Sequence, residues 1–234
     1  MKKLHSLFSI AMLAALMLVV VGCSDDDDNN PITSTPAAPA KVLIVHASPD
    51  APGVDVLVDN NPTALTDLTF PQNTGYVELP SGNRNVKVNV ANTTTTVINA
   101  DLMLDPSVNY TVFAVNSVSN IEPLVLVDDL TAPASGKAHV RFVHLSPDAP
   151  AVDIAVAGGG PVVFGNVSFK EFQGFTPLDA GTYNLEVRLA GTGTVVLPLG
   201  NITISDGMIY TVFAKGFAAG SGAQALGAEI IVNN

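Results

Sequence analysis

The chain has 234 residues and a formal net charge of −11 at pH 7. This acidic balance repels nucleic acid and anionic lipid head groups, so neither is expected to be a direct partner. Hydrophobic residues make up 47% of the sequence and charged residues 13%, which is a globular rather than a disordered composition. Tryptophan is absent and aromatic residues make up 6%, which disfavours a stacking platform for sugars or bases.

Residues 1–22 have the pattern of an export signal peptide. Two lysines near the start precede an apolar run from Leu7 to Val21, which is too short for a transmembrane helix. Residues Val20 to Cys23 resemble the lipobox of bacterial lipoproteins. The resemblance implies cleavage before Cys23, a lipid such as palmitate on that cysteine, and anchoring in the bacterial cell envelope, at the outer membrane. An uncleaved signal anchor is the alternative.

Residues 23–40 are expected to form a disordered tether. The four adjacent carboxylates of Asp25 to Asp28 repel one another and favour a solvated spacer. Residues Pro31 to Ala40 are rich in Pro, Thr, Ser and Ala, which favour extended, unpaired backbone. A second interpretation of the acidic run remains open. Directly after a lipidated cysteine, it resembles the surface-export signal of some Bacteroidetes lipoproteins, which would imply exposure on the cell surface.

The rest of the chain contains an internal duplication. The stretch from His46 to Asp55 reads HASPDAPGVD, and 98 residues later the stretch from His144 to Asp153 reads HLSPDAPAVD. A Tyr-Thr-Val-Phe-Ala segment also occurs twice, beginning at residues 110 and 210. The repeat predicts module one at residues 41–129, a linker at 130–137 and module two at 138–234. Each module is long enough to bury a core of its own.

The pattern within each module predicts strands. Short runs of alternating apolar residues are separated by Gly, Pro and Asn turns, and no segment has a capped helical period. We therefore expect an all-β chain of two tandem Ig-like, antiparallel β-sandwich modules with roughly seven strands each. Val42 to Ala47 is apolar on both faces, which indicates an interior strand, and Leu65 to Phe70 is expected to be a further extended run. Arg141 stands where module one has Leu43, so one face of that strand is expected to be less buried in module two.

The duplicated stretch carries the candidate site residues, which are His46, Ser48, Asp50, Asp55, His144, Ser146, Asp148 and Asp153. Three interpretations are open. In the structural one, the first aspartate of each copy bonds turn amides, and the histidine pairs with the last aspartate across the hairpin. In the second, the carboxylates and turn carbonyls bind calcium, although two carboxylates per copy are few and zinc would need more His or Cys. In the third, the loop binds a ligand such as a surface protein or a glycan.

Catalysis has less support in these residues. A serine nucleophile needs a base and an orienting group placed by the fold, and no Gly-x-Ser-x-Gly elbow occurs. The occurrence of a second copy is also more typical of a structural element than of an active site. We expect no enzyme activity and no cofactor. The alternative is a metal-dependent hydrolase of the envelope that uses His46 and His144.

The duplicated HxSPDAPxVD stretch, the turn at Ser81-Gly82 and Ala180-Gly181, and the Tyr-Thr-Val-Phe-Ala strand resemble a bacterial family known as domain of unknown function 4397. The resemblance covers residues 41 to 232. It implies a secreted or surface protein, with the domain in tandem, and it offers no activity to carry over. The resulting expectation is a lipid-anchored envelope protein that serves as a non-catalytic binding or structural module.

Overall fold

The computed structural model describes residues 36–234, which are all β apart from two short 3-10 turns, Val118–Asn120 and Gly222–Gln224. The predictions for the signal peptide, for Cys23 and for most of the tether concern residues 1–35 and lie outside the described residues. Within residues 36–234 we find no helix that is both long and apolar enough to span a bilayer.

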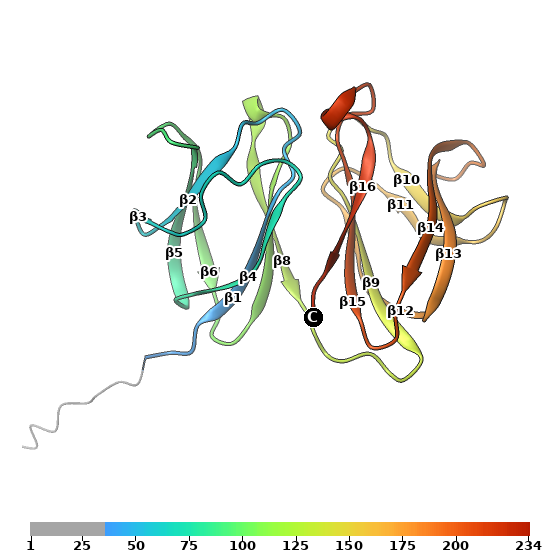
Figure 1. Cartoon of the computed structure of the whole chain (residues 1–234), viewed down its shortest axis with the longest axis horizontal. Helices are drawn as coiled ribbons and strands as arrows, with labels where there is room; N and C mark the ends of the chain where they lie inside the picture. Colours follow the sequence, from blue (N-terminus) through green and yellow to red (C-terminus); the bar gives the residue numbers. More distant parts are fainter. Residues whose placement is uncertain (1–35) are drawn as a thin grey trace, which may run out of the picture. The chain divides into compact units, whose positions relative to one another are not determined.

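Each half of the described chain contains eight strands, one more than expected (Figure 1). In module one these are β1 Ala40–His46, β2 Val54–Val58, β3 Asn61–Pro62, β4 Asn73–Leu79, β5 Gly82–Val90, β6 Thr96–Leu104, β7 Asn109–Val115 and β8 Glu122–Asp128. In module two they are β9 Lys137–His144, β10 Val152–Val156, β11 Val162–Val167, β12 Phe172–Asp179, β13 Gly181–Leu189, β14 Val195–Ile204, β15 Ile209–Lys215 and β16 Gly227–Val232.

The strands of each module form two four-stranded sheets, so the expected tandem β-sandwich is confirmed. The sheets that we call inner have the orders β4-β1-β7-β8 and β12-β9-β15-β16. The outer sheets have the orders β3-β2-β5-β6 and β11-β10-β13-β14. Pairing is antiparallel except between β1 and β7 and between β9 and β15, which run parallel. The two modules therefore repeat the same topology strand for strand.

One detail of module one differs from the expectation. Leu65 to Phe70 is mostly loop, and only Leu68 makes a bridge, to Val54. A local apolar pattern does not distinguish a loop that lies on the core from a strand, because both bury the same side chains.

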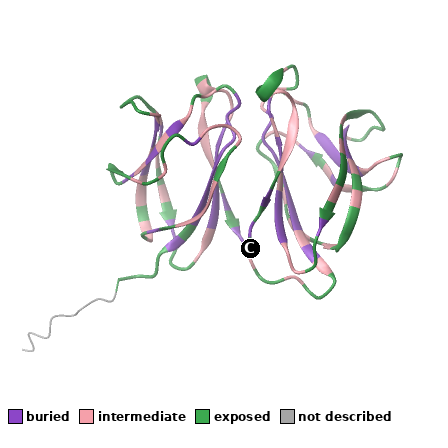
Figure 2. Ribbon diagram, viewed as in Figure 1, coloured by how far each residue is buried: buried purple, intermediate pink, exposed green. Residues whose placement is uncertain are grey.

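The prediction of an interior strand at Val42 to Ala47 is confirmed, because β1 lies between β4 and β7. Successive side chains of a strand point to opposite faces of the sheet. Val42 and Ile44 belong to the core of module one, whereas Leu43 and Val45 belong to a third apolar cluster that both modules share. Figure 2 shows in purple the buried segments that run along the inner sheets.

This third cluster is an interface between the two inner sheets. Module one contributes Leu43, Val45, Ala47, Phe113, Val115 and Leu126, and module two contributes Val143, Leu145, Phe213 and Ile231. The rings of Phe113 and Phe213 meet edge to face with centroids 5.8 Å apart. A fully buried apolar side chain of this size contributes about 1.5–3 kcal/mol, so the interface holds the modules together without disulfides.

Arg141 lies in this interface, and the expectation that its strand face is less buried is wrong. Its side chain is 1% exposed and its Nη1 lies 2.6 Å from Oδ1 of Asp128, at the end of β8 in module one. The guanidinium also donates to the hydroxyls of Thr111 and Thr211 and stacks 4.6 Å over the ring of Phe175. A charged residue can replace leucine here because the other module supplies its counter-ion.

The second oxygen of Asp128 completes the polar network. It accepts hydrogen bonds from the hydroxyls of Tyr76 at 2.5 Å and Thr111 at 2.6 Å. Asn233 in turn donates to the Tyr76 hydroxyl at 3.1 Å and accepts from Thr211 at 2.8 Å. Burial, together with the Asp128 carboxylate, raises the pKa of Tyr76, so the phenol stays a donor. The buried charges are thus paired and hydrogen-bonded, as a stable interior requires.

The network breaks the near-symmetry of the interface. Arg141 occupies the position of Leu43. Asn233 occupies the position of Asp128, because Asn233 bonds to Ile209 of β15 and Asp128 lies opposite the equivalent Asn109 of β7. Two copies of the module-one surface would bury two carboxylates, and two copies of the module-two surface would bury two guanidiniums. Unpaired buried charges are strongly destabilising. The interface therefore requires one module of each kind.

We expect Arg141→Leu to lower the free energy of unfolding by about 3–5 kcal/mol, because it leaves the Asp128 carboxylate buried without a cation. Adding Asp128→Asn should recover much of that loss, since the double variant carries the residues found at the opposite, symmetry-related positions. Urea unfolding of the wild type, both single variants and the double variant gives the coupling energy. Strictly additive losses would contradict a coupled pair.

Candidate functional site

The two copies of the HxSPDAPxVD stretch form equivalent corners. Corner one, His46–Asp55, joins β1 to β2, and corner two, His144–Asp153, joins β9 to β10. The histidine and serine of each copy are completely buried; these residues are His46, Ser48, His144 and Ser146. The corners are therefore part of the sandwich interior at one end of each module.

Each corner histidine is held by the carbonyl of the second proline in its own corner. Nε2 of His46 donates to the carbonyl of Pro52 at 3.0 Å, and Nε2 of His144 donates to that of Pro150 at 3.1 Å. Because a carbonyl only accepts, the proton lies on Nε2 and Nδ1 is an acceptor in the neutral ring. Burial lowers the pKa of both histidines, so each is held neutral.

The expected pairing of His46 with Asp55 and of His144 with Asp153 is wrong. The two carboxylate oxygens of Asp55 accept the backbone amides of Asp67 and Asn92, both at 2.9 Å. The histidine side chain points into the module on β1, whereas Asp55 alternates with the core residues of β2 and so points away from the core. The histidine and the aspartate therefore lie on different faces.

Asp153 repeats this arrangement in module two. Its oxygens accept the amides of Asn166 at 2.6 Å and Gly191 at 2.8 Å. Asp153 is 6% exposed and therefore more buried than Asp55, which is half-buried. One carboxylate thus fastens two loops in module one, and in module two it fastens strand β11 and the turn between β13 and β14.

The first aspartate of each corner bonds an amide, but not one of its own turn. Oδ1 of Asp50 accepts the amide of Val118 at 2.8 Å, and Oδ1 of Asp148 accepts that of Ala218 at 2.6 Å. These amides lie in the loops after β7 and β15, about 70 residues along the chain. The corners therefore tie the start of each module to its last loop.

Four buried polar atoms at the corners have no hydrogen-bond partner within residues 36–234. They are Nδ1 of His46 and His144 and Oγ of Ser48 and Ser146. No hydrogen bond joins the serine to the histidine in either corner, so the pair is not arranged as a nucleophile and its base. Since the same atoms are unpaired in both modules, this feature belongs to the corner itself.

The described part of the chain contains no group of three His, Cys, Asp or Glu residues that could hold a metal ion. The corner carboxylates are instead engaged by backbone amides. The calcium interpretation therefore has no ligand set among these residues.

A cavity next to corner two was not foreseen from the sequence. It encloses about 180 Å³ between the sheets of module two, and its lining includes Phe142, His144, Pro150, Leu197 and Leu226. The signal in the sequence was the run of small residues at Gly227 and Ala228, but only the strand register shows what these residues face.

The depressed histidine pKa values predict a stability that depends on pH. Below pH about 6.5 the unfolded chain takes up protons on both histidines that the folded protein does not. Stability should be full above that pH and fall as the pH decreases, by up to about 1.4 kcal/mol per pH unit for each histidine. Urea unfolding between pH 5 and 7.5 measures the slope. In the double variant His46→Gln/His144→Gln, which keeps a donor for each carbonyl, the dependence of the unfolding free energy on pH should vanish. An unchanged dependence would refute the assignment to these histidines.

Asp153→Ala should destabilise the protein by about 1–3 kcal/mol for each amide that loses its buried acceptor. Asp55→Ala is the matched control in module one. Its loss should be smaller, because the amides of Asp67 and Asn92 are exposed and water can replace the carboxylate. Thermal and urea unfolding of the two variants test this order. Equal losses would show that burial does not set the cost.

Comparisons with known proteins add a family but no activity. No curated protein sequence matches the chain. One similar solved structure is the C-terminal domain of AlgF from P. aeruginosa, with 23% identity, 42% of this chain and 98% of that chain covered, and a TM-score of 0.32. Another is CBMbc, of family CBM26, from Eubacterium rectale Amy13K in complex with maltoheptaose, with 11% identity, 82% and 96% covered, and a TM-score of 0.26. Both TM-scores are too low to bear on function.

The sequence pattern of one family matches most of the chain, over residues 40–155 and 156–233. The second match begins inside β10, so the matched stretches do not divide where the sheets divide. On this basis the chain belongs to the family described as Domain of unknown function (DUF4397), of which it carries two tandem copies.

Proposed function

We propose that this chain is a lipid-anchored protein of the bacterial cell envelope whose two modules form one non-catalytic binding body. The lipobox-like residues Val20 to Cys23 support the anchor, and the acidic run after them supports display at the outer surface of the outer membrane. The membrane is then a partner through the lipid alone, since the acidic chain itself repels anionic head groups.

The observation that carries the non-catalytic assignment is the use of the corner groups. The histidines are completely buried and donate to carbonyls of their own corners, and the aspartates hold backbone amides of distant loops. A general acid or base must reach its substrate within hydrogen-bond distance. The same bonds occur in both modules, as expected of a building element.

The two corners lie at the same end of the two-module unit, as contacts across the interface show. Lys170, beside corner two, forms an ion pair of 2.9 Å with Glu122 of β8. Lys215 of β15 lies 5.6 Å from the ring of Phe70, which in turn packs on His46 of corner one. Loops at the end of a sandwich commonly carry recognition, so this shared end is the proposed binding face.

A protein suits this face better than a glycan. Glycans and bases are usually bound by stacking on exposed aromatic rings. Among the large exposed hydrophobic residues of the described chain, Phe172 is the one aromatic. The alternative of a calcium-binding module or metal-dependent hydrolase finds no support in residues 36–234, where no metal-binding group of three occurs.

The anchor is tested by growing cells with labelled palmitate and separating their membranes. The wild type should carry the label and sediment with the outer membrane, whereas Cys23→Ser should do neither; Ser24→Ala is the matched control and should behave as wild type. Cys23 is the only cysteine of the sequence, so it is the one thiol to which the lipid can be attached. A protease added to intact cells should then degrade the protein. Wild-type protein that stays unlabelled in the soluble fraction would overturn the proposal.

A further inference from the structure

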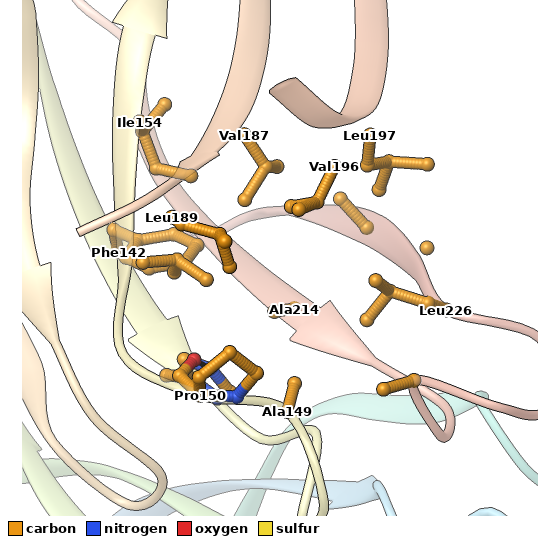
Figure 3. A pocket seen from close by; sticks show the side chains of 15 residues that line it. Phe142, Ala149, Pro150, Ile154, Val187, Leu189, Val196, Leu197, Ala214 and Leu226 are labelled. Atoms are coloured by element: carbon orange, nitrogen blue, oxygen red, sulfur yellow. Dashed lines mark hydrogen bonds between the residues drawn. The ribbon is translucent and has the colours of Figure 1, made fainter. Parts of the chain in front are cut away.

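The cavity of module two lies between the outer and inner sheets, at the end that carries corner two. Fifteen residues line it, and His144 is the one with a polar side chain. Figure 3 shows apolar side chains around the space, with Phe142 and Leu189 on one side and Leu226 across from them. No charged side chain lines it, so an ion would lose its hydration without compensation.

The corresponding cavity of module one encloses about 30 Å³, and His46 is not among the residues that line it. The strand registers explain the difference. Ala228 lies opposite Ala214 in module two, whereas the equivalent pair in module one is Pro123 and Ala114.

A second difference between the modules lies in the loop before the last strand, which borders the same cavity. The amide that bonds the first corner aspartate belongs to Ala218 in module two and to Val118 in module one. Ala228 and Ala218 both line the cavity, and both are smaller than Pro123 and Val118 at the equivalent positions of module one.

The corner histidine is also covered differently in the two modules. In module one the ring of Phe70 packs against His46, with the ring centroids 6.4 Å apart. In module two His144 lines the cavity. Its Nε2 already donates to the carbonyl of Pro150 and its Nδ1 is buried, so the ring offers the cavity no free polar atom.

The volume sets the size of the ligand. An engineered protein cavity of about 150 Å³ with an aliphatic and aromatic lining stays dry and binds benzene. We infer that module two binds a small uncharged molecule of the size of a single ring, held between the sheets by apolar contacts. This site goes beyond the proposed protein-binding face and does not depend on it.

The test uses the purified protein with a ¹⁵N-labelled backbone, titrated with phenol as a single-ring probe. Phenol should cause saturable shifts at Ala149 and at Leu226 to Ala228, which line the cavity. Shifts that do not saturate, or that scatter over both modules, would overturn the site.

Ala228→Pro is the decisive variant, because proline occupies the equivalent edge-strand position in module one and is compatible with the ladder there. It should fill the cavity and weaken phenol binding by at least about tenfold. Ala218→Val, which copies Val118, should act in the same direction. Pro123→Ala is the matched control in module one and should leave unchanged the affinity measured from the module-two shifts at Ala149 and at Leu226 to Ala228. Phenol binding that survives in both cavity variants would refute the inference.

Discussion

The buried ion pair between Arg141 and Asp128 is the constraint on which the two-module arrangement depends. Neither side chain reaches water, and each lies in a different module, so separation of the modules would leave both charges without their partner. The apolar residues around the pair would accept many relative positions of two similar sheets. The ion pair, with its threonine and tyrosine partners, accepts one, because its hydrogen bonds have fixed directions. The interface thus gains its strength from packing and its specificity from charge.

The corners perform the corresponding task inside each module. Asp50 and Asp148 connect the first turn to the last loop. Asp55 fastens two loops of module one, and Asp153 fastens strand β11 and a turn of module two. All four carboxylates accept backbone amides, which any sequence can supply, so the corner persists while the loops around it differ. The bonds are the same in both copies. What distinguishes the modules must therefore be sought where the copies differ, at Arg141 and at the residues around the cavity.

The sequence predicts the parts of the structure that follow from local pattern. Alternating apolar residues locate the strands, and the two apolar faces of Val42 to Ala47 indicate an interior strand. The partner of its second face could not be predicted, because that partner lies in the other module. For the same reason Arg141 suggested exposure, although Asp128 neutralises it. The predicted pairing of His46 with Asp55 is wrong because the two residues, although close along the chain, point to different faces of the module. The cavity depends on Ala228 and Ala218 lying opposite corner two, which only the register shows.

Strand β9 connects the interface to the cavity. Neighbouring residues of a strand point to opposite faces, so Arg141 lies in the interface while Phe142 lines the cavity. Strand β15 has the same division, with Phe213 in the interface and Ala214 at the cavity. Two walls of the cavity are therefore the backs of strands that the interface holds in place. In module one Pro123 lines a much smaller cavity, and Asp128 of the same strand pairs with Arg141. The first module thus helps to hold strand β9 in place, and the second module contains the larger cavity behind that strand.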